Sequence, residues 1–385
     1  MKIVHLCISA FYIDNCSYQE NLLPKYHAKM GYDVTIIASL ATYDKDGNYM
    51  ILDKPSEYIN SDGIKVYRLG YKKPFVKFSK LLLRYQGLYK LLESEAPDII
   101  FSHNIVALDM LEVVRYLKKH PDVKLFGDNH LDYINNKPSD KFKLIQKAIH
   151  STWVYCTKQV EKHIIRCYGV TPMRCRYICD RYHLNPDKVA FLPMGVDDEA
   201  IPQQRDMVRC QIRKELHIKA GDFVIFTGGK IDRLKNTHIL VEAFSRINRP
   251  DVHLIICGLI KPEMSMLLQQ IEQIPQIHYL GWCNAERIMN CMVASDLACF
   301  PGTHSTLWEQ SVGIGLPAIF KRWPEMEHVN VNDNCLFVNG SDPKELRNAI
   351  ETLLIPENYS HMAHQASAAS IQFRYSEIAR KAIQV

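Results

Sequence analysis

Several features that would place this chain in a membrane or redox class are missing from its sequence. None of its apolar runs approaches the roughly 18 to 20 residues that a membrane-spanning helix needs. No Gly-x-Gly-x-x-Gly follows the first apolar run, residues 3–9, so a dinucleotide-dependent dehydrogenase is disfavoured. No nucleic-acid-binding module is recognisable either, and we expect no nucleic-acid partner.

The composition fits a globular protein of two domains. The chain has 385 residues, of which 47% are hydrophobic and 23% charged, and its formal net charge is +5. That length is too great for one ordinary core, and the composition is not that of a disordered chain. The N-terminal apolar run is short, Asp14 and Glu20 follow it, and it lacks a small-residue cleavage site. We expect a β-strand there rather than a signal sequence, and a cytoplasmic location.

Twelve cysteines are scattered along the chain, and most lie in apolar runs, as Cys257 does. Reduced, buried thiols are the expectation for such positions. One alternative is a zinc site on Cys175, Cys179 and His183, which are four apart and would share one face of a helix, with Cys167 nearby. The paired Cys-x-x-Cys knuckle is missing, and this face could simply pack inward. We predict no bound metal and no cofactor.

Short apolar runs recur in both halves of the chain, each followed by a longer stretch compatible with a helix. The runs are more often fully apolar than alternating, as expected for strands covered on both faces. Strand–helix alternation predicts right-handed crossovers and a parallel, doubly wound sheet in each half. We expect strands at residues 3–9, 34–39, 64–69, 99–102, 123–127, 153–157 and 189–192, and then at 223–227, 253–257, 277–280, 297–300, 318–320 and 335–338.

The two halves meet at Pro193 and Gly195, since a proline and a glycine close together interrupt regular structure. We predict an N-terminal Rossmann-like domain over residues 1–195 and a C-terminal one over 196–366. Residues 367–385 are typical of an amphipathic helix without a strand of its own, which could pack back on the first domain. Ligands bind at the carboxyl ends of such strands, so a cleft between the two sheets is the expected site.

The segment 300–310 carries the strongest functional signal. An apolar run ends in a Pro-Gly turn, small hydroxyl residues follow, and a short helical stretch then runs to the glycines and proline of 313–317. This arrangement places helix N–H groups just past the carboxyl end of a strand, where an anionic group binds readily. Glu309 lies one turn inside the helix and could accept hydrogen bonds from the hydroxyls of a ribose. The segment therefore predicts a site for a nucleotide diphosphate.

A second segment, residues 226–236, ends a predicted strand with two glycines and then carries cations at Lys230, Arg233 and Lys235. The glycines permit a close backbone approach, and both lysines could reach a diphosphate at the Ser305 helix start. A cationic surface turn is the alternative. Because both segments follow strands of one parallel sheet, we expect them at the same edge.

At these residues the chain resembles the retaining glycosyltransferases of family 4, which have the two-domain GT-B fold. Residues 229–230 and 235–236, Gly-Lys and Lys-Asn, stand where members carry Gly-Arg and then Lys-Gly. Residues 191–197 are similar to the Pro-Asn-Gly-Val-Asp segment that leads into the second domain. Residues 308–319 look like the Glu-Ala-Met-Ala-x-Gly-x-Pro-Val signature, and 97–103 match a common first-domain strand.

The chain departs from the family pattern at several positions. The family's paired glutamates stand eight positions apart, but the position eight before Glu309 is Pro301. A His-Ser pair at His304 occupies the place of a Gly-Phe-Gly loop, Lys230 replaces a bidentate arginine, and the loop 12–21 lacks a Gly-Gly pair. The missing glutamate contacts the donor sugar in the family. We expect His304 to take over part of that role, the alternative being an imidazole that only lines the loop.

The resemblance implies a metal-independent enzyme with a nucleotide diphosphate sugar donor in the second domain and a glycan or polyprenyl-linked acceptor in the first. The residues that it assigns to catalysis are His130, Lys230, Lys235 and Glu309. Those assigned to substrate binding are Gly229, His304, Ser305, Thr306, Trp282, Asn15 and Ser17. Trp282 could flank the nucleobase or be packed in a core.

The chemistry that the resemblance implies is transfer with retention of anomeric configuration. Negative charge develops on the leaving diphosphate, where cations and peptide N–H groups stabilise it. The donor phosphate itself takes the acceptor proton, so no protein base is needed. His130 resembles the histidine of the family's His-Asp loop and would position the donor sugar rather than act as a base. A structural role is its alternative, and His103 is a weaker candidate.

Other functions stay open at this point. Inverting transfer or epimerisation on the same fold would need a base, for which His130 and Asp14 are candidates. A non-catalytic nucleotide- or glycan-binding protein is compatible with the missing glutamate. The cations and aromatic residues of 71–78 suit peripheral contact with the inner membrane surface, an acidic acceptor, or a solvated loop. A role in cell-surface polysaccharide synthesis is an expectation from the resemblance alone.

Overall fold

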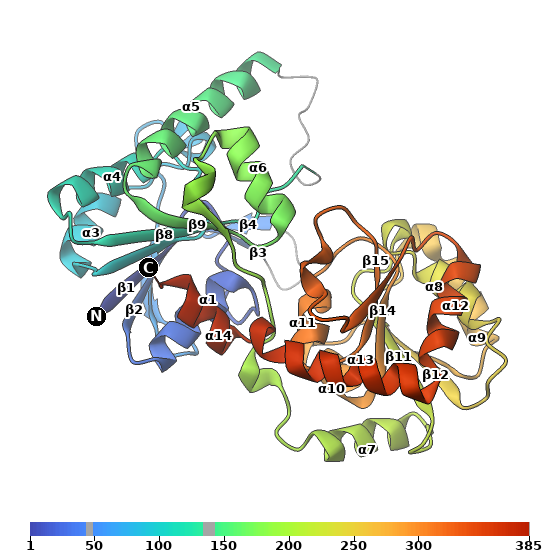
Figure 1. Ribbon diagram of the computed structural model, residues 1–385. Coiled ribbons are helices and arrows are strands. Elements are labelled where there is room, and N and C mark those ends of the chain that lie inside the picture. Colours follow the sequence, from blue (N-terminus) through green and yellow to red (C-terminus); the bar gives the residue numbers. More distant parts are fainter. Residues whose placement is uncertain (44–48, 134–142, 385) are drawn as a thin grey trace. The chain divides into compact units, whose positions relative to one another are not determined.

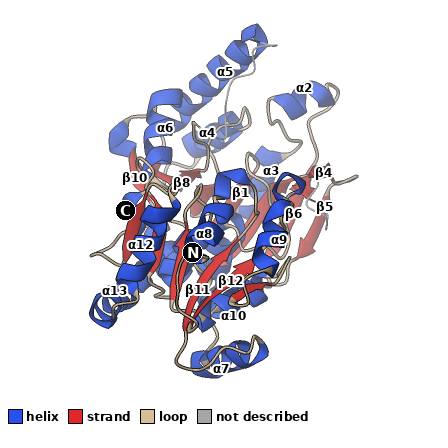
Figure 2. Cartoon of the chain, turned by 90° about the vertical axis from the view of Figure 1, so that its right-hand side faces the viewer, coloured by secondary structure: helices blue, strands red, loops and turns tan. Residues whose placement is uncertain are grey.

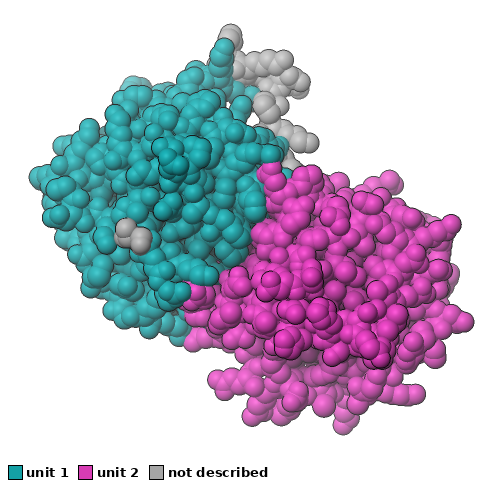
Figure 3. All heavy atoms as spheres, in the orientation of Figure 1, with its two compact units in different colours: residues 1–193, 378–385 teal, residues 194–377 magenta. Residues whose placement is uncertain are grey.

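The computed structural model describes residues 1–43, 49–133 and 143–384 of the chain, whose helices and strands are traced in Figure 1. The chain divides into two compact units, which Figure 3 colours separately. The first unit contains Met1–Pro193 and Ile378–Val385, and the second contains Met194–Glu377. Strands and helices alternate in both units (Figure 2), and the predicted α/β class with two Rossmann-like, largely parallel sheets is confirmed.

The first unit is built on an eight-stranded sheet with the strand order β10-β9-β8-β7-β1-β2-β6-β5. Its neighbouring strands pair in parallel except β5 and β6. Strand order reverses between β1 and β7, which makes their carboxyl ends the expected place for ligands. The strands are β1 (Lys2–Cys7), β2 (Asp33–Ser39), β5 (Ser56–Ile59), β6 (Lys65–Leu69), β7 (Ile99–Ser102), β8 (Lys124–Asn129), β9 (Ile164–Gly169) and β10 (Val189–Phe191), and a separate pair is formed by β3 (Ala41–Tyr43) and β4 (Tyr49–Ile51).

Strand β1 is buried on both faces, so helices pack on both sides of it. Val4 and Leu6 share a core with Leu92 and other residues of α3 and α4. Because side chains alternate along a strand, His5 lies on the opposite face, where it hydrogen-bonds to His27 of α1. A histidine thus stands among the apolar residues of a central strand. The helices of this unit are α1 (Gln19–Lys29), α2 (Val76–Leu81), α3 (Leu88–Glu95), α4 (Met110–Lys119), α5 (Lys143–Glu161) and α6 (Pro172–Tyr182).

The second unit is built on a six-stranded sheet with the order β13-β12-β11-β14-β15-β16. All of its strands are parallel, and strand order reverses between β11 and β14. The strands are β11 (Phe223–Gly228), β12 (Val252–Cys257), β13 (Ile277–Tyr279), β14 (Leu297–Phe300), β15 (Ala318–Lys321) and β16 (Cys335–Val338). Every strand predicted for this half of the chain is present.

Alternate residues of these strands belong to two separate cores. Val224 and Phe226 of β11 pack with residues of α7, α10 and α11, whereas Ile225 between them packs with α8, α9 and α12. Figure 1 shows α11 on one side of β14 and α8 on the other. Burial on both faces explains why the strands are apolar rather than alternating in sequence. The helices are α7 (Arg205–Glu215), α8 (Thr237–Phe244), α9 (Met266–Glu272), α10 (Ala285–Ala294), α11 (Leu307–Gly313), α12 (Pro343–Leu353) and α13 (Pro356–Ala369).

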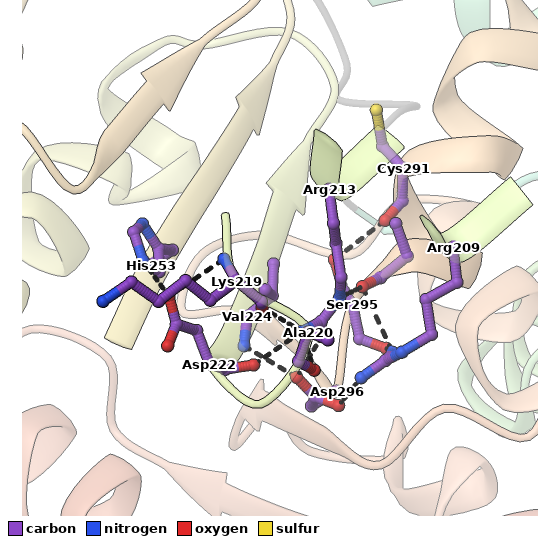
Figure 4. A network of polar contacts seen from close by, with 11 residues as sticks. Arg209, Arg213, Lys219, Ala220, Asp222, Val224, His253, Cys291, Ser295 and Asp296 are labelled. Atoms are coloured by element: carbon purple, nitrogen blue, oxygen red, sulfur yellow. Dashed lines mark hydrogen bonds and ion pairs between the residues drawn. The ribbon is translucent and has the colours of Figure 1, made fainter. Parts of the chain in front are cut away.

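A buried ion network closes the amino edge of the second sheet (Figure 4). Asp296, just before β14, pairs with Arg209 and Arg213 of α7, and its Oδ2 atom also accepts the Val224 N–H at 2.8 Å. Arg213 is only 3% exposed and donates further hydrogen bonds to the carbonyls of Ala220 and 222. A buried arginine is tolerated because it is paired and hydrogen-bonded in this way. The network fastens α7 to the sheet.

The strand predicted at residues 153–157 is wrong, because these residues lie in helix α5. Trp153, Val154 and Tyr155 favour a strand locally, but Cys156 and Val160 are fully buried at the four-residue spacing of a helix. The strand of this region is β9 (Ile164–Gly169), which was not predicted.

The single C-terminal helix predicted over 367–385 is also wrong. Helix α13 ends at Ala369, a 3-10 turn spans Ser370–Phe373, and α14 follows at Tyr375–Ala382. The break occurs where Val196 donates to the Phe373 carbonyl at 2.8 Å and its own carbonyl accepts the Tyr375 N–H at 3.1 Å. Extended pairing with the linker thus interrupts the helix. Residues 367–377 group with the second unit and Ile378–Val385 with the first. None of the described helices is both long and apolar enough to span a bilayer.

Candidate functional site

Both informative segments of the second unit lie at the carboxyl edge of its sheet. Strand β11 ends at Gly228, β14 ends at Phe300, and the two strands are neighbours. The strand order reverses between them, and crossovers that leave on opposite faces open a crevice at such a point. The expectation that 226–236 and 300–310 share one edge is therefore confirmed.

The two segments are packed backbone against backbone. A Cβ atom on Gly302 would lie 2.2 to 2.3 Å from backbone atoms of Lys235, so only glycine fits there. The Thr303 N–H donates to the Leu234 carbonyl at 2.9 Å. The Asn236 amide donates to the carbonyls of Pro301 at 3.1 Å and of residue 340 at 2.8 Å. The 3-10 turn Arg233–Lys235 and the loop 301–304 thus form one scaffold.

Lys235 holds this scaffold together from within. Its Nζ atom donates to the carbonyls of Thr303 at 2.8 Å and His304 at 2.9 Å, and burial lowers the pKa of its ammonium group. Two of its three N–H donors therefore serve the loop, which the sequence did not indicate. Lys230 is exposed, and its charge lies close enough to affect Lys235. Of the two predicted cations, Lys230 is the better placed to meet a ligand.

Glu309 is fully buried in α11, and histidines hold only one side of its carboxylate. Its Oε1 atom lies 2.7 Å from Nε2 of His304 and 2.9 Å from Nε2 of His328. Burial alone would raise the pKa of this carboxyl, but His304 and His328 outweigh it and hold the pKa below its ordinary value. The Oε2 atom is buried and has no hydrogen-bond partner among the described residues. An unsatisfied buried acceptor costs about 1 to 3 kcal/mol, so this oxygen is a natural place for a hydroxyl donor from a ligand.

His328 is a site residue that sequence reasoning missed. It lies in the 3-10 turn Glu327–Val329, after strand β15, nineteen positions beyond Glu309. No spacing rule links the two positions, because their meeting depends on β15 pairing beside β14. The available signal was that a histidine follows the next strand of the same parallel sheet.

The remaining candidates of this unit lie around the same edge or farther along it. Gly229 has a φ of 104°, a left-handed conformation that favours glycine, and a Cβ there would lie 3.7 Å from Leu307 at the start of α11. Ser305 and Thr306 are half-buried just before that helix, which has only seven residues and hence a modest dipole. Trp282 follows β13 and is 69% exposed, so the packed alternative is wrong.

The first unit carries the other three candidates. Asn15 and Ser17 are exposed in the loop between β1 and α1. His130 follows β8 and places its Nε2 atom 3.5 Å from Oδ2 of the fully buried Asp128. Burial alone would lower the pKa of His130, but the carboxylates of Asp128 and Glu20 raise it. His130 is therefore held as a cation more readily than a free imidazole.

The alternative zinc site of the first unit is wrong. Cys175 and Cys179 lie on α6, but that helix ends at Tyr182, and His183 has a φ of 57° and is exposed. His183 therefore does not continue the helical face. In the part of the chain that the structure describes, the donor atoms of His304, Glu309 and His328 gather within 4.8 Å of one another. Both imidazoles there already hydrogen-bond the carboxylate.

Comparisons with known proteins agree with this architecture. The family model described as glycosyl transferases group 1 matches residues 208–370, and that of glycosyltransferase family 4 matches residues 22–200. A search of curated protein sequences finds no match.

Solved structures share the fold over both units. They include Anabaena Alr3699/HepE in complex with UDP (TM-score 0.68, 16% identity, 99% of this chain and 98% of that chain). A glycosyltransferase from Rickettsia africae ESF-5 has a TM-score of 0.67 at 15% identity, covering 99% and 96%. Sucrose-phosphate synthase from Thermosynechococcus elongatus has a TM-score of 0.64 at 14% identity, covering 99% and 97%. The two family models, which together cover most of the chain, show that it belongs to the family 4, group 1 glycosyltransferases, and the shared fold is of the GT-B type.

Proposed function

We propose that this glycosyltransferase moves a sugar, with retention and without a metal ion, from a nucleotide diphosphate donor bound by the second unit. The acceptor is a glycan or polyprenyl-linked glycan bound by the first unit, and the pathway is cell-surface polysaccharide synthesis. The observation that carries the donor site is the buried carboxylate of Glu309. Two imidazoles contact one of its oxygens, and the other has no partner in the described part of the chain.

Glu309 is the group that recognises the donor's ribose in this proposal. Its ionised carboxylate accepts hydrogen bonds, and a charge-assisted bond from a hydroxyl is stronger than a neutral one. His304 and His328 fix the orientation of the carboxylate through Oε1. The unpartnered Oε2 then accepts a ribose hydroxyl. Solved Anabaena Alr3699/HepE is in complex with UDP, so UDP-sugars are the first donors to test.

The departing diphosphate is stabilised by Lys230 and by peptide N–H groups of residues 304–306. Lys230 is exposed, whereas Lys235 holds the loop that presents these N–H groups. Fixed donors of this type act where charge develops in the transition state. The sequence has an Asp-x-Asp triplet at residues 44–46, whose two carboxylates could bind a metal ion and which lies outside the described residues. Metal independence is therefore tested directly, by measuring activity after EDTA treatment.

Inverting transfer would need a protein base, for which Asp14 and His130 are the candidates. The hydrogen bonds of Asp14 and the raised pKa of His130 favour retention instead. Asp14 accepts hydrogen bonds from Arg68 at 3.0 Å and from Tyr58 at 2.8 Å, and Arg68 is 1% exposed. Both of its carboxylate oxygens therefore already accept hydrogen bonds within the first unit. His130 has a raised pKa and positions the transferred sugar as a hydrogen-bond donor, as the family resemblance implies. The anomeric configuration of the product, determined by NMR, separates retention from inversion.

Peripheral contact with the inner membrane surface is proposed for the segment that contains α2. Phe75 is 75% exposed and Phe78 is 54% exposed, and lysines at 72, 73 and 77 surround them. Exposed aromatic side chains beside cations suit the interface of an anionic membrane. Such a surface would bring the enzyme to a polyprenyl-linked acceptor.

Isothermal titration calorimetry with UDP, GDP and ADP tests the donor site. The wild type is compared with Glu309→Gln, which keeps the side-chain volume, and with Glu263→Gln, an exposed glutamate of the same unit, as the matched control. We expect one nucleotide to bind the wild type and the control with equal affinity and the Glu309 variant at least tenfold more weakly. Equal affinity in all three proteins would refute the assigned role. Absence of sugar transfer from every donor tested would refute the enzymatic proposal.

A further inference from the structure

A chain of buried polar groups crosses the first unit and has no part in the proposed reaction so far. The Nδ1 atom of His103 lies 2.9 Å from Oδ2 of Asp128, and its Nε2 lies 3.1 Å from Nδ1 of His5. The Nε2 atom of His5 lies 2.9 Å from Nδ1 of His27, whose Nε2 lies 2.8 Å from the Ala379 carbonyl of α14. Asp128 and all three histidines are fully buried. We call these four side chains the histidine relay.

The fold itself brings the relay together. His5 stands on β1, and His103 directly follows β7, its neighbour across the point where strand order reverses. The rings of His5 and His103 are stacked with centroids 5.3 Å apart, and Phe101 packs against both. His27 comes from α1 on the same face. The rings are thus fixed by packing, and water does not compete for their nitrogen atoms.

The two ends of the relay decide how many protons it holds. A carboxylate and a backbone carbonyl can only accept, and a neutral imidazole carries one N–H and one acceptor nitrogen. Four contacts join the five groups, and each contact needs one proton. Three neutral imidazoles supply three, so in one contact two lone pairs would face each other in a dry interior. The geometry is satisfied only with a fourth proton.

The position of the fourth proton follows from the surroundings of each ring. The Ala379 carbonyl requires a proton on Nε2 of His27, which makes its Nδ1 the acceptor for His5. Burial lowers the pKa of His27 to about 4, and burial and the neighbouring histidines lower the pKa of His5 well below its ordinary value. Although burial alone would raise the pKa of Asp128, His103 and His130 hold it well below the ordinary value. The extra proton therefore lies on His103, facing an ionised Asp128.

We propose that the histidine relay stores one proton beyond those of three neutral imidazoles, and that the resulting His103–Asp128 ion pair makes Asp128 the positioning residue for His130. The second part rests on the proposed function, whereas the stored proton does not. Because the relay ends on a carbonyl, which has no proton to pass on, it stores a proton rather than conducting one.

Hydrogen bonds from two other elements fix the Asp128 carboxylate in the orientation that it needs to position His130. Its Oδ1 atom accepts the Asn104 N–H at 2.9 Å, and its Oδ2 accepts the Gln19 amide at 3.0 Å in addition to His103. The carboxylate is thereby fixed from two other elements while His130 stands 3.5 Å away. Among the described residues, the other titratable or charged groups that face the relay and His130 include Glu20 on α1, Tyr32, which packs edge-on against the His27 ring, Cys7 on β1, Cys167 on β9 and Arg174 on α6.

The Asp128→Asn variant is designed to remove the stored proton without disrupting the fold. The new amide can donate to Nδ1 of His103, and the relay then runs in one direction with three neutral imidazoles and all four contacts satisfied. The side-chain amide of Gln19 can rotate so that its Oε1 atom, which is buried and has no partner among the residues described, accepts from the new amide. We therefore expect this variant to fold, with circular dichroism like that of the wild type.

The stored proton is tested by two-bond ¹H–¹⁵N NMR spectra of the full-length protein with ¹⁵N-labelled histidine at pH 7. In the wild type, we expect His5 and His27 as neutral Nε2–H tautomers and His103 as an imidazolium. In Asp128→Asn, all three are expected to be neutral. His278→Asn is the matched control, because His278 contacts His253 beside Asp222 in the second unit and should leave these signals unchanged. Three neutral imidazoles in the wild type would overturn the proposal.

The positioning of His130 is tested by the pH profile of sugar transfer. Without the Asp128 charge, burial lowers the pKa of His130, so the alkaline limb of activity moves to lower pH. We expect kcat of Asp128→Asn to fall about tenfold more at pH 8 than at pH 6, because less of its His130 carries the second ring proton at the higher pH. An equal loss at every pH would indicate a purely structural role and overturn this part. If the wild type transfers no sugar at all, the proposed function fails while the NMR result still decides the stored proton.

Discussion

Each unit has a fully buried carboxylate at the carboxyl edge of its sheet, and two imidazoles contact each of them. Asp128 of the first unit has both oxygens occupied, by a backbone N–H, the Gln19 amide and His103. Glu309 of the second unit has one oxygen occupied and the other without a partner among the described residues. The same residue types thus stabilise the structure in the first unit and leave one acceptor atom open in the second. In our proposal, this open oxygen, and not the buried carboxylate as such, marks the ligand site.

The strongest test of this comparison is Glu309→Gln beside Asp128→Asn. Glu309→Gln removes the charge that we propose binds the donor, and we expect kcat/KM to fall about 10² to 10³-fold, the range for loss of a fixed electrostatic group. Nucleotide affinity should fall in this variant and remain unchanged in Asp128→Asn. Steady-state kinetics and calorimetry check both. Equal loss of nucleotide affinity in the two variants would show that the two carboxylates do not differ in the way described.

The second test concerns the two lysines of the donor edge. We expect Lys230→Gln to lower kcat about 10²-fold with little change in the melting temperature, because in the proposed reaction the exposed ammonium would contact the leaving group. Lys235→Gln should lower both kcat and the melting temperature, because the Lys235 ammonium donates hydrogen bonds to two carbonyls of the loop. Lys214→Gln, an exposed lysine of α7, is the control and should change neither. Differential scanning fluorimetry measures the melting temperature and single-turnover kinetics measures the rate of transfer. If both lysine variants change the two quantities alike, Lys230 and Lys235 do not have the different roles proposed here.

The third test disrupts the scaffold formed by the 3-10 turn Arg233–Lys235 and the loop 301–304, by adding one methyl group. A Cβ at position 302 would overlap backbone atoms of Lys235, so we expect Gly302→Ala to reduce the free energy of unfolding by about 2 to 4 kcal/mol. Gly221→Ala is the matched control, since a Cβ there meets open space. Urea denaturation measures both. A Gly302 variant as stable as the control would mean that the two loops are not packed as described.

A smaller effect is expected from the imidazoles that hold Glu309. Since His328 helps to lower the pKa of Glu309, His328→Gln should raise that pKa and so protonate the carboxyl at higher pH. The loss of nucleotide affinity on acidification should then begin at a higher pH than in the wild type. Calorimetry from neutral pH down to the lowest pH at which both proteins stay folded checks the shift. An unchanged acid midpoint would mean that His328 does not tune the carboxylate.

The smallest effect is expected at the surface around α2. We expect Phe78→Ser to weaken binding to vesicles of anionic lipid several-fold, because one aromatic side chain no longer enters the interface. Met266→Ser on α9 removes a side chain that is 68% exposed and should leave binding unchanged. Co-sedimentation measures the difference. If neither protein nor variant binds vesicles, the proposed membrane contact is wrong.

Much of the fold could be predicted because it depends on local pattern. Apolar runs at 223–227 and 253–257 predict buried parallel strands, and their order along the chain predicts which edge carries the loops. The pattern failed at residues 153–157, where a β-prone stretch is part of a nineteen-residue helix. Helical spacing of Cys156 and Val160 against the core outweighed local propensity there.

The sequence by itself determined the chemistry available at each strand end: glycines for close approach, cations at Lys230 and Lys235, and a carboxylate at Glu309. It also determined the family, because motif order and spacing are properties of the chain alone. Only the tertiary structure decided which partner each group has. The strand order places His328 in contact with Glu309. The close packing at Gly302 places the Lys235 side chain against the loop that it stabilises. The reversal of strand order between β1 and β7 places His5 next to His103. Hydrogen bonds between residues far apart in sequence depend on sheet order, which local patterns do not encode.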